Sequence, residues 1–473
     1  MVLIQNSKQF DSTCKGKTMN QLIKAMKKED NKTTTLNGAK AFKSSKNALV
    51  DLFGGWGGMR GKDIIPMYAN ALQEDKTLAN KIILWGRDVR EGAGERELFR
   101  TAIKYLANTN WKEAIKVIQK IPELGRWDDL LELHDTPVWP ECQKLIKNAL
   151  MDGHALCAKW MPRKGPIAVD LTKYMRLTPK QYRKLLVSTT NVVENKMCAQ
   201  QWDKINYNHV PSQAARIYSK AFQRHDPIGY TNYKQALIKG EAKINAGAIF
   251  PHEILSSLGR QEQIAEAQWK ALPDWVPDNL SFLPLIDTSG SMGNWERTGS
   301  PANIAISLGL YLSERNKSAF KDTFITFSEY PQLQSVNGNL SAKCKQMSKA
   351  AWSMNTNINL AFRLILNTAT KHKVSKKDMP THILIISDMQ FDGSWDKTNY
   401  NEIKEMYKQS GYDLPKIIFW NVNYYGNMPV KMDKENTALV SGFSPSVMKS
   451  ILLNKMTPWD QMMETISNPR YNY

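Results

Sequence analysis

The chain has 473 residues, an apolar fraction of 42% and 64 Lys and Arg against 45 Asp and Glu, which gives a formal charge of +19. The apolar fraction excludes a chain that is disordered throughout, and the length allows two or three domains. The charge favours a polyanionic partner, most simply nucleic acid, although a basic surface kept for solubility is the alternative.

The cysteines and the distribution of apolar residues indicate in which cellular compartment the protein is expected. The five cysteines are widely spaced and form no Cys-x-x-Cys pair, which argues against a zinc site or a disulfide framework and favours reduced thiols in the cytoplasm. No segment approaches the roughly 18 apolar residues of a membrane span, and the N-terminus has no continuous apolar run. We therefore expect neither a membrane span nor a secretory signal.

Residues 1–46 are polar and rich in lysine, and acidic residues are few among them. Two interpretations are equally open. The segment is either a flexible basic arm, or an arm that clamps RNA or docks on the next domain.

Residues 47–277 show helical periodicity. Leu78, Ile82 and Trp85 recur at spacings of four and three, and helical segments follow one another between Gly and Pro breaks. Successive helix pairs are typical of α-solenoids, so we predict HEAT-like helical repeats without an exact period. The Gly-rich run Gly54–Lys62 lacks the spacing of a phosphate-binding loop, and we predict a flexible turn there.

Residues 278–473 alternate short apolar runs with helices, after a linker at 274–278. The predicted strands are Phe282–Ile286, Thr323–Phe327, His382–Ile386 and Lys416–Val422. The predicted helices are Ala302–Glu314, Ile358–Thr370, Tyr400–Ser410 and Pro445–Leu453. This alternation predicts an α/β domain with a doubly wound, parallel sheet.

The most informative motif is an apolar run that ends in Asp-x-Ser-x-Ser. If the run is a buried strand, Asp287, Ser289 and Ser291 follow its carboxyl end, where ligands gather in open α/β sheets. Thr356 precedes a predicted helix, and Asp388 follows a second apolar run. We expect these five side chains to surround one cation. Hard oxygen ligands with only one or two carboxylates are typical of Mg²⁺.

The same residues allow other interpretations. A simple Asx or Ser turn would need no metal. The serines do not lie in a Gly-x-Ser-x-Gly elbow, and no histidine is near them in the sequence, which argues against a hydrolytic triad. A metal-dependent phosphohydrolase built on Asp287 and Asp388 is a further alternative, but a two-metal mechanism usually needs more carboxylates. We therefore expect no enzymatic activity.

In this order, the five residues resemble the metal-ion-dependent adhesion site (MIDAS) of von Willebrand factor A domains. The resemblance implies that Asp287, Ser289 and Ser291 anchor Mg²⁺ or another divalent cation. It further implies that Thr356 ligates the ion directly and that Asp388 acts through water. One coordination position would then stay open for a carboxylate or another anion of a partner.

Three stretches of the helical half are distinctive: Leu84–Arg96, Gly125–Leu130 and Lys159–Arg163. Helix packing with caps and local ion pairs would explain the first two. Together with an A domain, the three stretches resemble the TROVE module of the Ro autoantigen family. They are closer still to an uncharacterised TROVE-like family of viruses and eukaryotes. The resemblance implies a ring of helical repeats closed by the A domain, with small noncoding RNA on its outer face and single-stranded RNA ends in a basic central hole.

Basic residues of the helical half are the candidate RNA contacts. They are Lys159, Arg163, Lys164, Lys173, Arg176, Lys180, Arg183, Lys184, His209, Arg216, Lys220, Arg224, Lys239 and Lys243. Lys180 and Lys184 share a helix face, and Tyr182 and Tyr207 offer rings for base stacking. The predicted function is that of a cytoplasmic, non-enzymatic RNA-binding protein. The alternative is a scaffold, possibly a viral or phage assembly protein, that docks acidic partners through the metal site without RNA.

Overall fold

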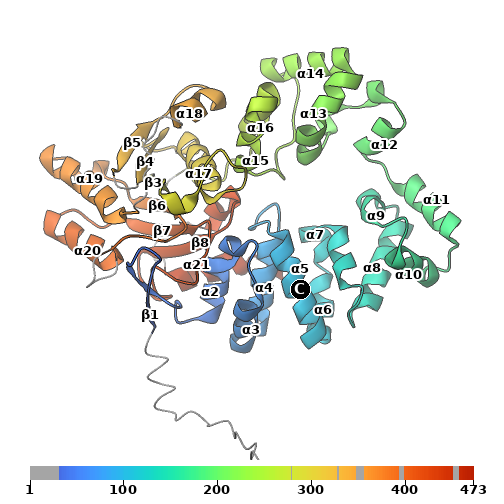
Figure 1. Cartoon of the computed structure of the whole chain (residues 1–473), viewed down its shortest axis with the longest axis horizontal. Coiled ribbons are helices and arrows are strands. Elements are labelled where there is room, and N and C mark those ends of the chain that lie inside the picture. Colours follow the sequence, from blue (N-terminus) through green and yellow to red (C-terminus); the bar gives the residue numbers. More distant parts are fainter. Residues whose placement is uncertain (1–30, 279, 328–329, 348–355, 394–398, 451–456) are drawn as a thin grey trace, which may run out of the picture.

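The computed structural model describes residues 31–278, 280–327, 330–347, 356–393, 399–450 and 457–473. It contains a helical part followed by an α/β part (Figure 1), as the sequence predicts. Among the described residues, no helix is both long and apolar enough to cross a membrane.

Fifteen labelled α-helices make up the helical part. They are α2 (Ala48–Gly55), α3 (Ile65–Glu74), α4 (Lys76–Arg87), α5 (Arg96–Thr109), α6 (Trp111–Ile118), α7 (Ile121–Leu124), α8 (Trp139–Met151), α9 (Ala155–Trp160), α10 (Pro166–Tyr174), α11 (Pro179–Thr189), α12 (Val193–Cys198), α13 (Ser212–His225), α14 (Pro227–Lys239), α15 (Pro251–Leu255) and α16 (Glu262–Lys270). Side-chain caps fix several starts, because they satisfy amides that have no partner within the helix. Asn47 accepts from Val50 N at α2, and Thr178 begins a capping box at α11.

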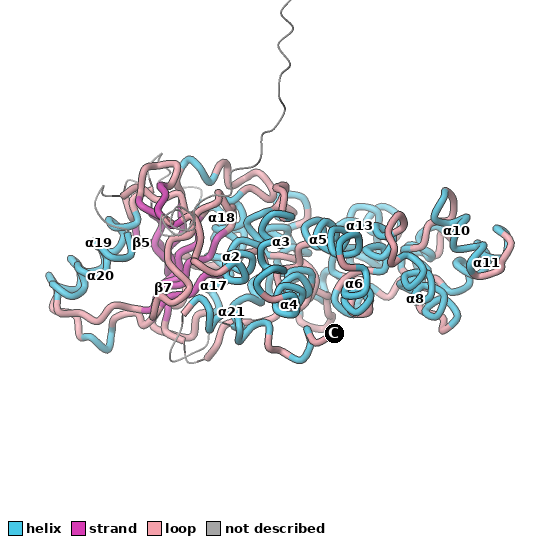
Figure 2. The backbone as a smooth tube through the Cα atoms, turned by 90° about the horizontal axis from the view of Figure 1, so that it is seen from below, coloured by secondary structure: helices cyan, strands magenta, loops and turns pink. Residues whose placement is uncertain are grey.

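The helical part follows a curved path in one layer. Figure 1 shows α2 to α6 running away from the sheet, α8 to α11 at the far end, and α12 to α14 returning to α16 beside the α/β part. Figure 2 shows the same layer from its edge. The first helix, α2, packs against the sheet as well. The helical part therefore meets the α/β part at both of its ends.

The α/β part contains one six-stranded sheet in the order β5-β4-β3-β6-β7-β8. Its strands are β3 (Phe282–Asp287), β4 (Thr323–Phe327), β5 (Gln332–Ser335), β6 (His382–Ser387), β7 (Lys416–Asn421) and β8 (Thr437–Ser441). All pairings are parallel except that of β5 with β4. The helices are α17 (Pro301–Arg315), α18 (Leu340–Met347), α19 (Ile358–Lys371), α20 (Asn399–Ser410) and α21 (Pro458–Ile466). Helix α17 lies on the side of the sheet that faces the helical part, and α19 and α20 lie on the other side (Figure 1).

The four predicted strands are present, each within one residue of its expected bounds, and three of the four predicted helices agree as closely. The fourth begins at Pro445 but is a 3₁₀ helix, Pro445–Ser450, and its expected end lies outside the described residues. Strands β5 and β8 were not predicted. Strand β5 is short, polar and at the edge of the sheet, so it carries no apolar run that would reveal it.

Residues 31–46 are not a flexible arm. They contain a hairpin of β1 (Lys32–Thr34) and β2 (Lys40–Phe42) that docks on the α/β part rather than on the adjacent helices. Phe42 N donates to Met428 O at 2.9 Å, and Thr35 Oγ1 donates to Phe391 O at 2.7 Å. Residues 1–30 of the predicted arm lie outside the described residues.

The prediction of a flexible turn at Gly54–Lys62 is wrong for most of the run. Gly54 and Gly55 end α2, and a buried 3₁₀ helix, η1 (Trp56–Met59), follows. A Cβ on Gly57 would lie 2.1 Å from the Cα of Gly442, which directly follows β8. Glycine is needed here because two backbones touch, which the local sequence does not reveal.

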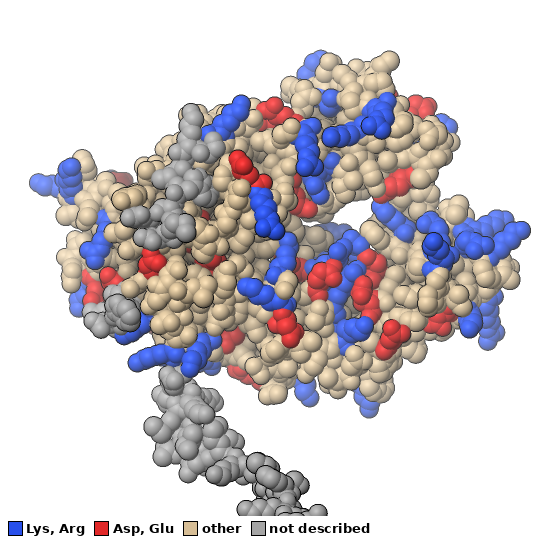
Figure 3. All heavy atoms as spheres, in the orientation of Figure 1, with Lys and Arg blue, Asp and Glu red and all other residues tan. Residues whose placement is uncertain are grey.

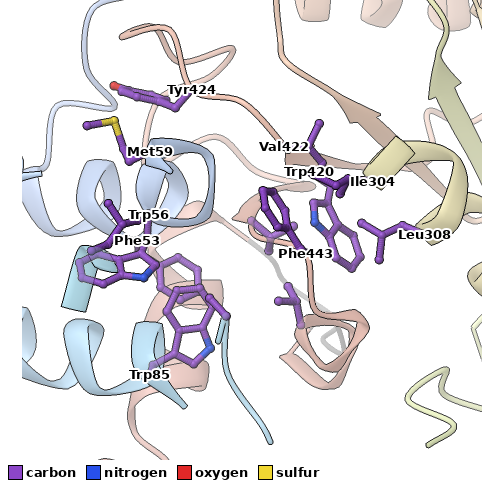
Figure 4. Packing of buried hydrophobic residues seen from close by; sticks show 14 of the residues in the cluster. Phe53, Trp56, Met59, Trp85, Ile304, Leu308, Trp420, Val422, Tyr424 and Phe443 are labelled. Atoms are coloured by element: carbon purple, nitrogen blue, oxygen red, sulfur yellow. The ribbon is translucent and has the colours of Figure 1, made fainter. Parts of the chain in front are cut away.

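Apolar packing joins the two parts at this contact, which we call the seam: α2 and η1 against β8 and Gly442. In Figure 4, Phe53 and Trp85 lie together on the helical side, and Trp420 and Phe443 lie on the sheet side. The ring centroids of Phe53 and Trp85 are 4.4 Å apart. One continuous apolar core includes all four side chains. The two parts are therefore a single packed unit at the seam.

Candidate metal site and basic surface

The carboxyl ends of β3 and β6 form the switch point of the sheet. Strand β3 pairs in parallel with β4 on one side and with β6 on the other, so the chain leaves β3 in one direction and returns on the opposite side. Such a point leaves a crevice for ligands at the carboxyl edge. Asp287 is the last residue of β3, and Asp388 directly follows β6. Both carboxylates are fully buried.

Asp287 is held by two donors. The Ser387 hydroxyl donates to Asp287 Oδ2 at 2.5 Å, and the amide of Ser289 donates to Asp287 Oδ1 at 2.9 Å. The second contact turns the chain sharply after β3, as an Asx turn does. This turn brings the Ser289 and Ser291 hydroxyls within 3.1 Å of each other.

Asp388 lies against the same loop. Ser291 acts on the pKa of Asp388 from close by, and the amide of Gln390 donates to Asp388 Oδ1 at 3.1 Å. Asp388 Oδ2 is buried and has no hydrogen-bond partner among the residues that the structure describes. Ser291 itself is exposed, so this side of the site opens to solvent. An acceptor atom that is buried and unpartnered is costly, and a cation would satisfy it.

The two carboxylates repel each other. Burial, and after it the charge of Asp388, raises the pKa of Asp287 to about 7. Burial likewise raises the pKa of Asp388. Two buried carboxylates that share a site cannot both ionise easily unless positive charge is added. Within the described part of the chain, no third His, Cys, Asp or Glu joins them in a metal-binding group, so further ligands would be hydroxyls and water.

Thr356 lies beside this group, fully buried, and its position is fixed from the N-terminal hairpin. Asn37 Nδ2 donates to Thr356 Oγ1 at 3.3 Å and to Gln390 O at 2.6 Å, two residues beyond Asp388. Thr356 N also donates to Asp392 Oδ2 at 2.7 Å. Asn37 therefore ties the loop before α19 to the loop after β6.

Lys62 adds positive charge to the rim of the crevice. Its ammonium donates to Asn423 Oδ1 at 2.9 Å and to the carbonyl of Tyr424, and it lies 4.4 Å from the centre of the Tyr425 ring. Its charge and that of Asp388 attract each other. An anion that approaches the site would meet this ammonium.

Thus direct contacts join Asp287, Ser289 and Ser291, and Asp388 is close enough to affect the pKa of Asp287. Asn37 links Thr356 to the loop that follows Asp388. Sequence reasoning missed Ser387, Asn37 and Lys62. Ser387 stands directly before Asp388 at the end of an apolar run, and this position was a usable signal. Asn37 and Lys62 are more than two hundred residues away from the motif, and no local pattern connects them to it.

The basic candidates gather most densely at the far end of the helical part. Residues 155–189 contain eight Lys and Arg and one acidic residue, Asp170. We call the exposed members of this group the basic tip: Arg163, Lys164, Lys173, Arg176, Lys180, Arg183 and Lys184. None of these seven forms an ion pair with a residue that the structure describes. Figure 3 shows Lys and Arg over this end of the molecule.

The other basic candidates differ in whether they form an ion pair. Lys159 pairs with Glu194 at 2.8 Å, and Arg216 lies 3.7 Å from Glu253. The remaining candidates are exposed and lie on or beside the returning helices: His209, Lys220, Arg224, Lys239 and Lys243.

The expected stacking role of two tyrosines is wrong. Tyr182 is 1% exposed and packs in the main core, and Tyr207 belongs to a smaller apolar cluster around Phe222 and Tyr230. Both rings face inward because they lie on the apolar sides of their elements. Neither ring is accessible to a base.

Arg87 and Arg126 of the first two distinctive stretches are neutralised locally. Arg87 pairs with Asp129 at 2.7 Å, and Arg100 of α5, outside these stretches, also pairs with Asp129, at 2.8 Å. Arg126 pairs with Asp128 and stacks on the Trp160 ring at 3.8 Å. Helix packing with local ion pairs accounts for Arg87 and Arg126, whereas the seven cations of the basic tip form no ion pair with a described residue.

The space-filling view shows an opening between the returning helices and the first helices of the chain (Figure 3).

The C-terminal segment contacts the first helices of the chain beside the seam. Arg470 Nε donates to buried Asp88 at 2.5 Å, and the Tyr473 hydroxyl donates to Glu113 at 3.0 Å. These contacts join the last residues of the chain to α4 and α6.

Comparison with known proteins identifies two sequence families, both described as domains of unknown function. DUF2828 matches residues 35–133 and 143–279, and DUF7788 matches residues 281–469. Among solved structures, the crystal structure of the Deinococcus radiodurans RO (RSR) protein matches 90% of this chain and 100% of that chain, with 14% sequence identity and a TM-score of 0.46.

Among curated proteins, "Uncharacterized protein L728" of Acanthamoeba polyphaga mimivirus is 31% identical over 490 aligned positions, which cover 89% of this chain and 85% of the relative. This match confirms the predicted kinship with an uncharacterised family that has viral members. The chain belongs to the same family as protein L728 of the mimivirus.

Proposed function

We propose that this protein is a non-enzymatic, cytoplasmic RNA-binding protein of the Ro type. It binds small noncoding or single-stranded RNA on the basic surface of its helical repeats. Its α/β part is a von Willebrand factor A domain whose Mg²⁺ site docks a partner. The proposal combines the motif resemblance with the charges and geometry described above.

The basic tip is the observation that carries RNA binding. Seven exposed cations without acidic partners form a surface that attracts phosphates regardless of base sequence. Lys159, which is not part of the basic tip, pairs with Glu194, but none of the seven cations of the tip forms an ion pair with a described residue. The opening in the ring offers a path for a single strand, in keeping with the Ro resemblance.

The strand order and the switch-point residues support the A domain. The residues fit a magnesium ion for two reasons. The two carboxylates repel each other and lie near two hydroxyls, and Asp388 Oδ2 has no hydrogen-bond partner among the described residues. Asp287, Ser289, Ser291, Thr356 and Asp388 would hold the ion. When bound, it would supply positive charge that attracts a partner's carboxylate at an open coordination position. Lys62 would strengthen that attraction.

Reversing charge on the basic tip tests RNA binding. Replacing Lys180, Arg183 and Lys184 by Glu is expected to weaken binding of a single-stranded RNA of about 20 nucleotides at least tenfold. The slope of log K against log salt concentration should fall by about two, since each lost phosphate contact on a single strand removes about 0.7 unit. Fluorescence anisotropy over a salt series measures both quantities.

The control carries the same charge change on the α/β part, where Lys321, Lys371 and Lys377 are exposed. Replacing these three residues by Glu should leave RNA affinity within about twofold. If both triple variants bind equally, or if the wild type binds no RNA, the proposal of an RNA surface fails. The scaffold alternative, in which only the metal site engages a partner, would then stand.

Asn37→Ala tests whether the hairpin positions Thr356. The substitution removes the amide that holds Thr356 Oγ1 and Gln390 O. We expect Mg²⁺ affinity, measured by calorimetry, to fall about tenfold, as losses of groups that orient a metal ligand do. Leu36→Ala is the control, because Leu36 is 70% exposed and its hydrogen bond to Gln390 uses the backbone amide. Equal magnesium affinity in the two variants would contradict a positioning role.

A further inference from the structure

A pocket of about 780 Å³ opens beside α20, away from both the metal site and the basic tip. Four surfaces line it: strand β2 through Phe42, one face of α20, the loop at 412–414 that precedes β7, and the segment 429–436 that precedes β8. Its volume lies within the range of sites that bind small molecules.

Four lysines surround this pocket. Lys404 and Lys408 are one turn apart on α20, and Lys431 and Lys434 come from the segment before β8. Burial, and after it the charge of Lys404, lowers the pKa of Lys434. Lys431 acts in the same direction, whereas Asp433 and Glu435 raise the pKa of Lys434. All four lysines line the same pocket, so one anion with several charged groups could contact them together.

Acidic groups do not neutralise this cluster in a fixed geometry. No described residue forms an ion pair with any of the four lysines. Of the acidic residues that line the pocket, Asp413 lies 3.6 Å from Lys376, and Asp433 and Glu435 are exposed to solvent. The four cations are therefore available to a ligand.

Aromatic rings form the rest of the wall. Lys434 Nζ lies 4.6 Å from the centre of the Tyr400 ring, and Lys431 Nζ lies 5.3 Å from that of Phe42. Tyr400 is buried, but the Phe42 ring is partly exposed. A planar base can stack on an exposed aromatic face while the phosphates of the same nucleotide contact nearby cations.

Tyr407 supplies a second, independent observation. Its side chain lines the pocket and is 1% exposed, yet its hydroxyl has no hydrogen-bond partner among the described residues. Burying a hydroxyl without a partner is unfavourable. A ligand with oxygen acceptors would satisfy it.

We propose that this pocket binds a nucleotide with two or more phosphates. Lys404, Lys408, Lys431 and Lys434 contact the phosphates, and the base lies against the partly exposed ring of Phe42. This binding is independent of the magnesium site and of RNA at the basic tip, and it gives the α/β part a ligand of its own.

Calorimetric titration of the full chain with ATP tests the proposal. The buffer contains EDTA, so that the metal site contributes nothing. The double variant Lys404→Gln, Lys434→Gln is expected to bind ATP at least tenfold more weakly than the wild type, because it loses two charge-assisted contacts. Tyr407→Phe is expected to weaken ATP binding about threefold, because it loses one hydroxyl contact.

The control variant Lys371→Gln, Lys377→Gln removes the same charge outside the pocket and should bind ATP as the wild type does. Asp287→Asn should also leave ATP binding unchanged, which separates this proposal from that of the metal site. Circular dichroism melting checks that each variant folds. Absence of ATP binding at millimolar concentration, or equal binding by the two double variants, would overturn the proposal. If tripolyphosphate binds as tightly as ATP, the proposed contact between the base and the Phe42 ring is wrong.

Discussion

Asp287→Asn is expected to abolish the stabilisation of this protein by magnesium. At a magnesium concentration of about 100 Kd, the wild type gains about 2.7 kcal/mol of unfolding free energy. The variant should gain almost none, because an amide is a poor ligand for Mg²⁺ next to a single remaining carboxylate. Denaturant unfolding in magnesium and in EDTA measures the difference.

The same substitution should remove a pH dependence of the stability of the metal-free protein. Burial and the charge of Asp388 raise the pKa of Asp287 in the folded protein to about 7, whereas an unfolded aspartate titrates near 4. The protonated side chain therefore favours the folded state below pH 4. This contribution, roughly 4 kcal/mol, is lost as the pH rises to 7. Asp287→Asn stays neutral and should show no such loss in EDTA.

Asp378→Asn is the matched control, because Asp378 is exposed on a short turn before β6. It should keep both the magnesium effect and the pH dependence of the wild type. A metal-free wild type whose stability does not fall between pH 4 and 7 would contradict the buried carboxylate pair. A magnesium effect that survives in Asp287→Asn would exclude Asp287 as a ligand.

Gly57→Ala is expected to destabilise the protein by about 3 kcal/mol or more, a large value for one added methyl group. Its Cβ would lie 2.1 Å from Gly442 Cα and 2.2 Å from Gly442 N, so backbone rather than a flexible side chain must move. The shift would also break the bond from Gly57 N to Ser441 Oγ, which is 2.9 Å long. Equilibrium unfolding in urea measures the loss.

Because Gly57 lies at the seam, Gly57→Ala should also weaken the contact between the helical part and the α/β part. Small-angle scattering should show a larger radius of gyration than that of the wild type under native conditions. Gly259→Ala is the control, since a Cβ at Gly259 meets no atom within 4 Å and its φ is not in the left-handed region. Equal stability of the two alanine variants would mean that the seam is not tightly packed.

The sequence by itself determined the strands that end at the candidate site. The runs at Phe282–Ile286 and Ile383–Ile386 are apolar because both faces of a parallel sheet are covered. Asp287 directly follows the first run, and Asp388 follows the second after Ser387. Alternation of strands with helices then fixes which strand ends share an edge. Local patterns alone therefore named five candidate residues, and their role in binding a metal stays a prediction.

Only the tertiary structure decided which distant residues contact the candidate site and which residues join the helical part to the α/β part. Asn37 reaches Thr356 across 319 residues, and Gly57 meets Gly442 only because α2 returns to the edge of the sheet. Hydrophobic periodicity describes which face of an element is buried and not what covers it. The inward rings of Tyr182 and Tyr207 have the same cause, because the packing of neighbouring helices decides which aromatic side chains remain accessible.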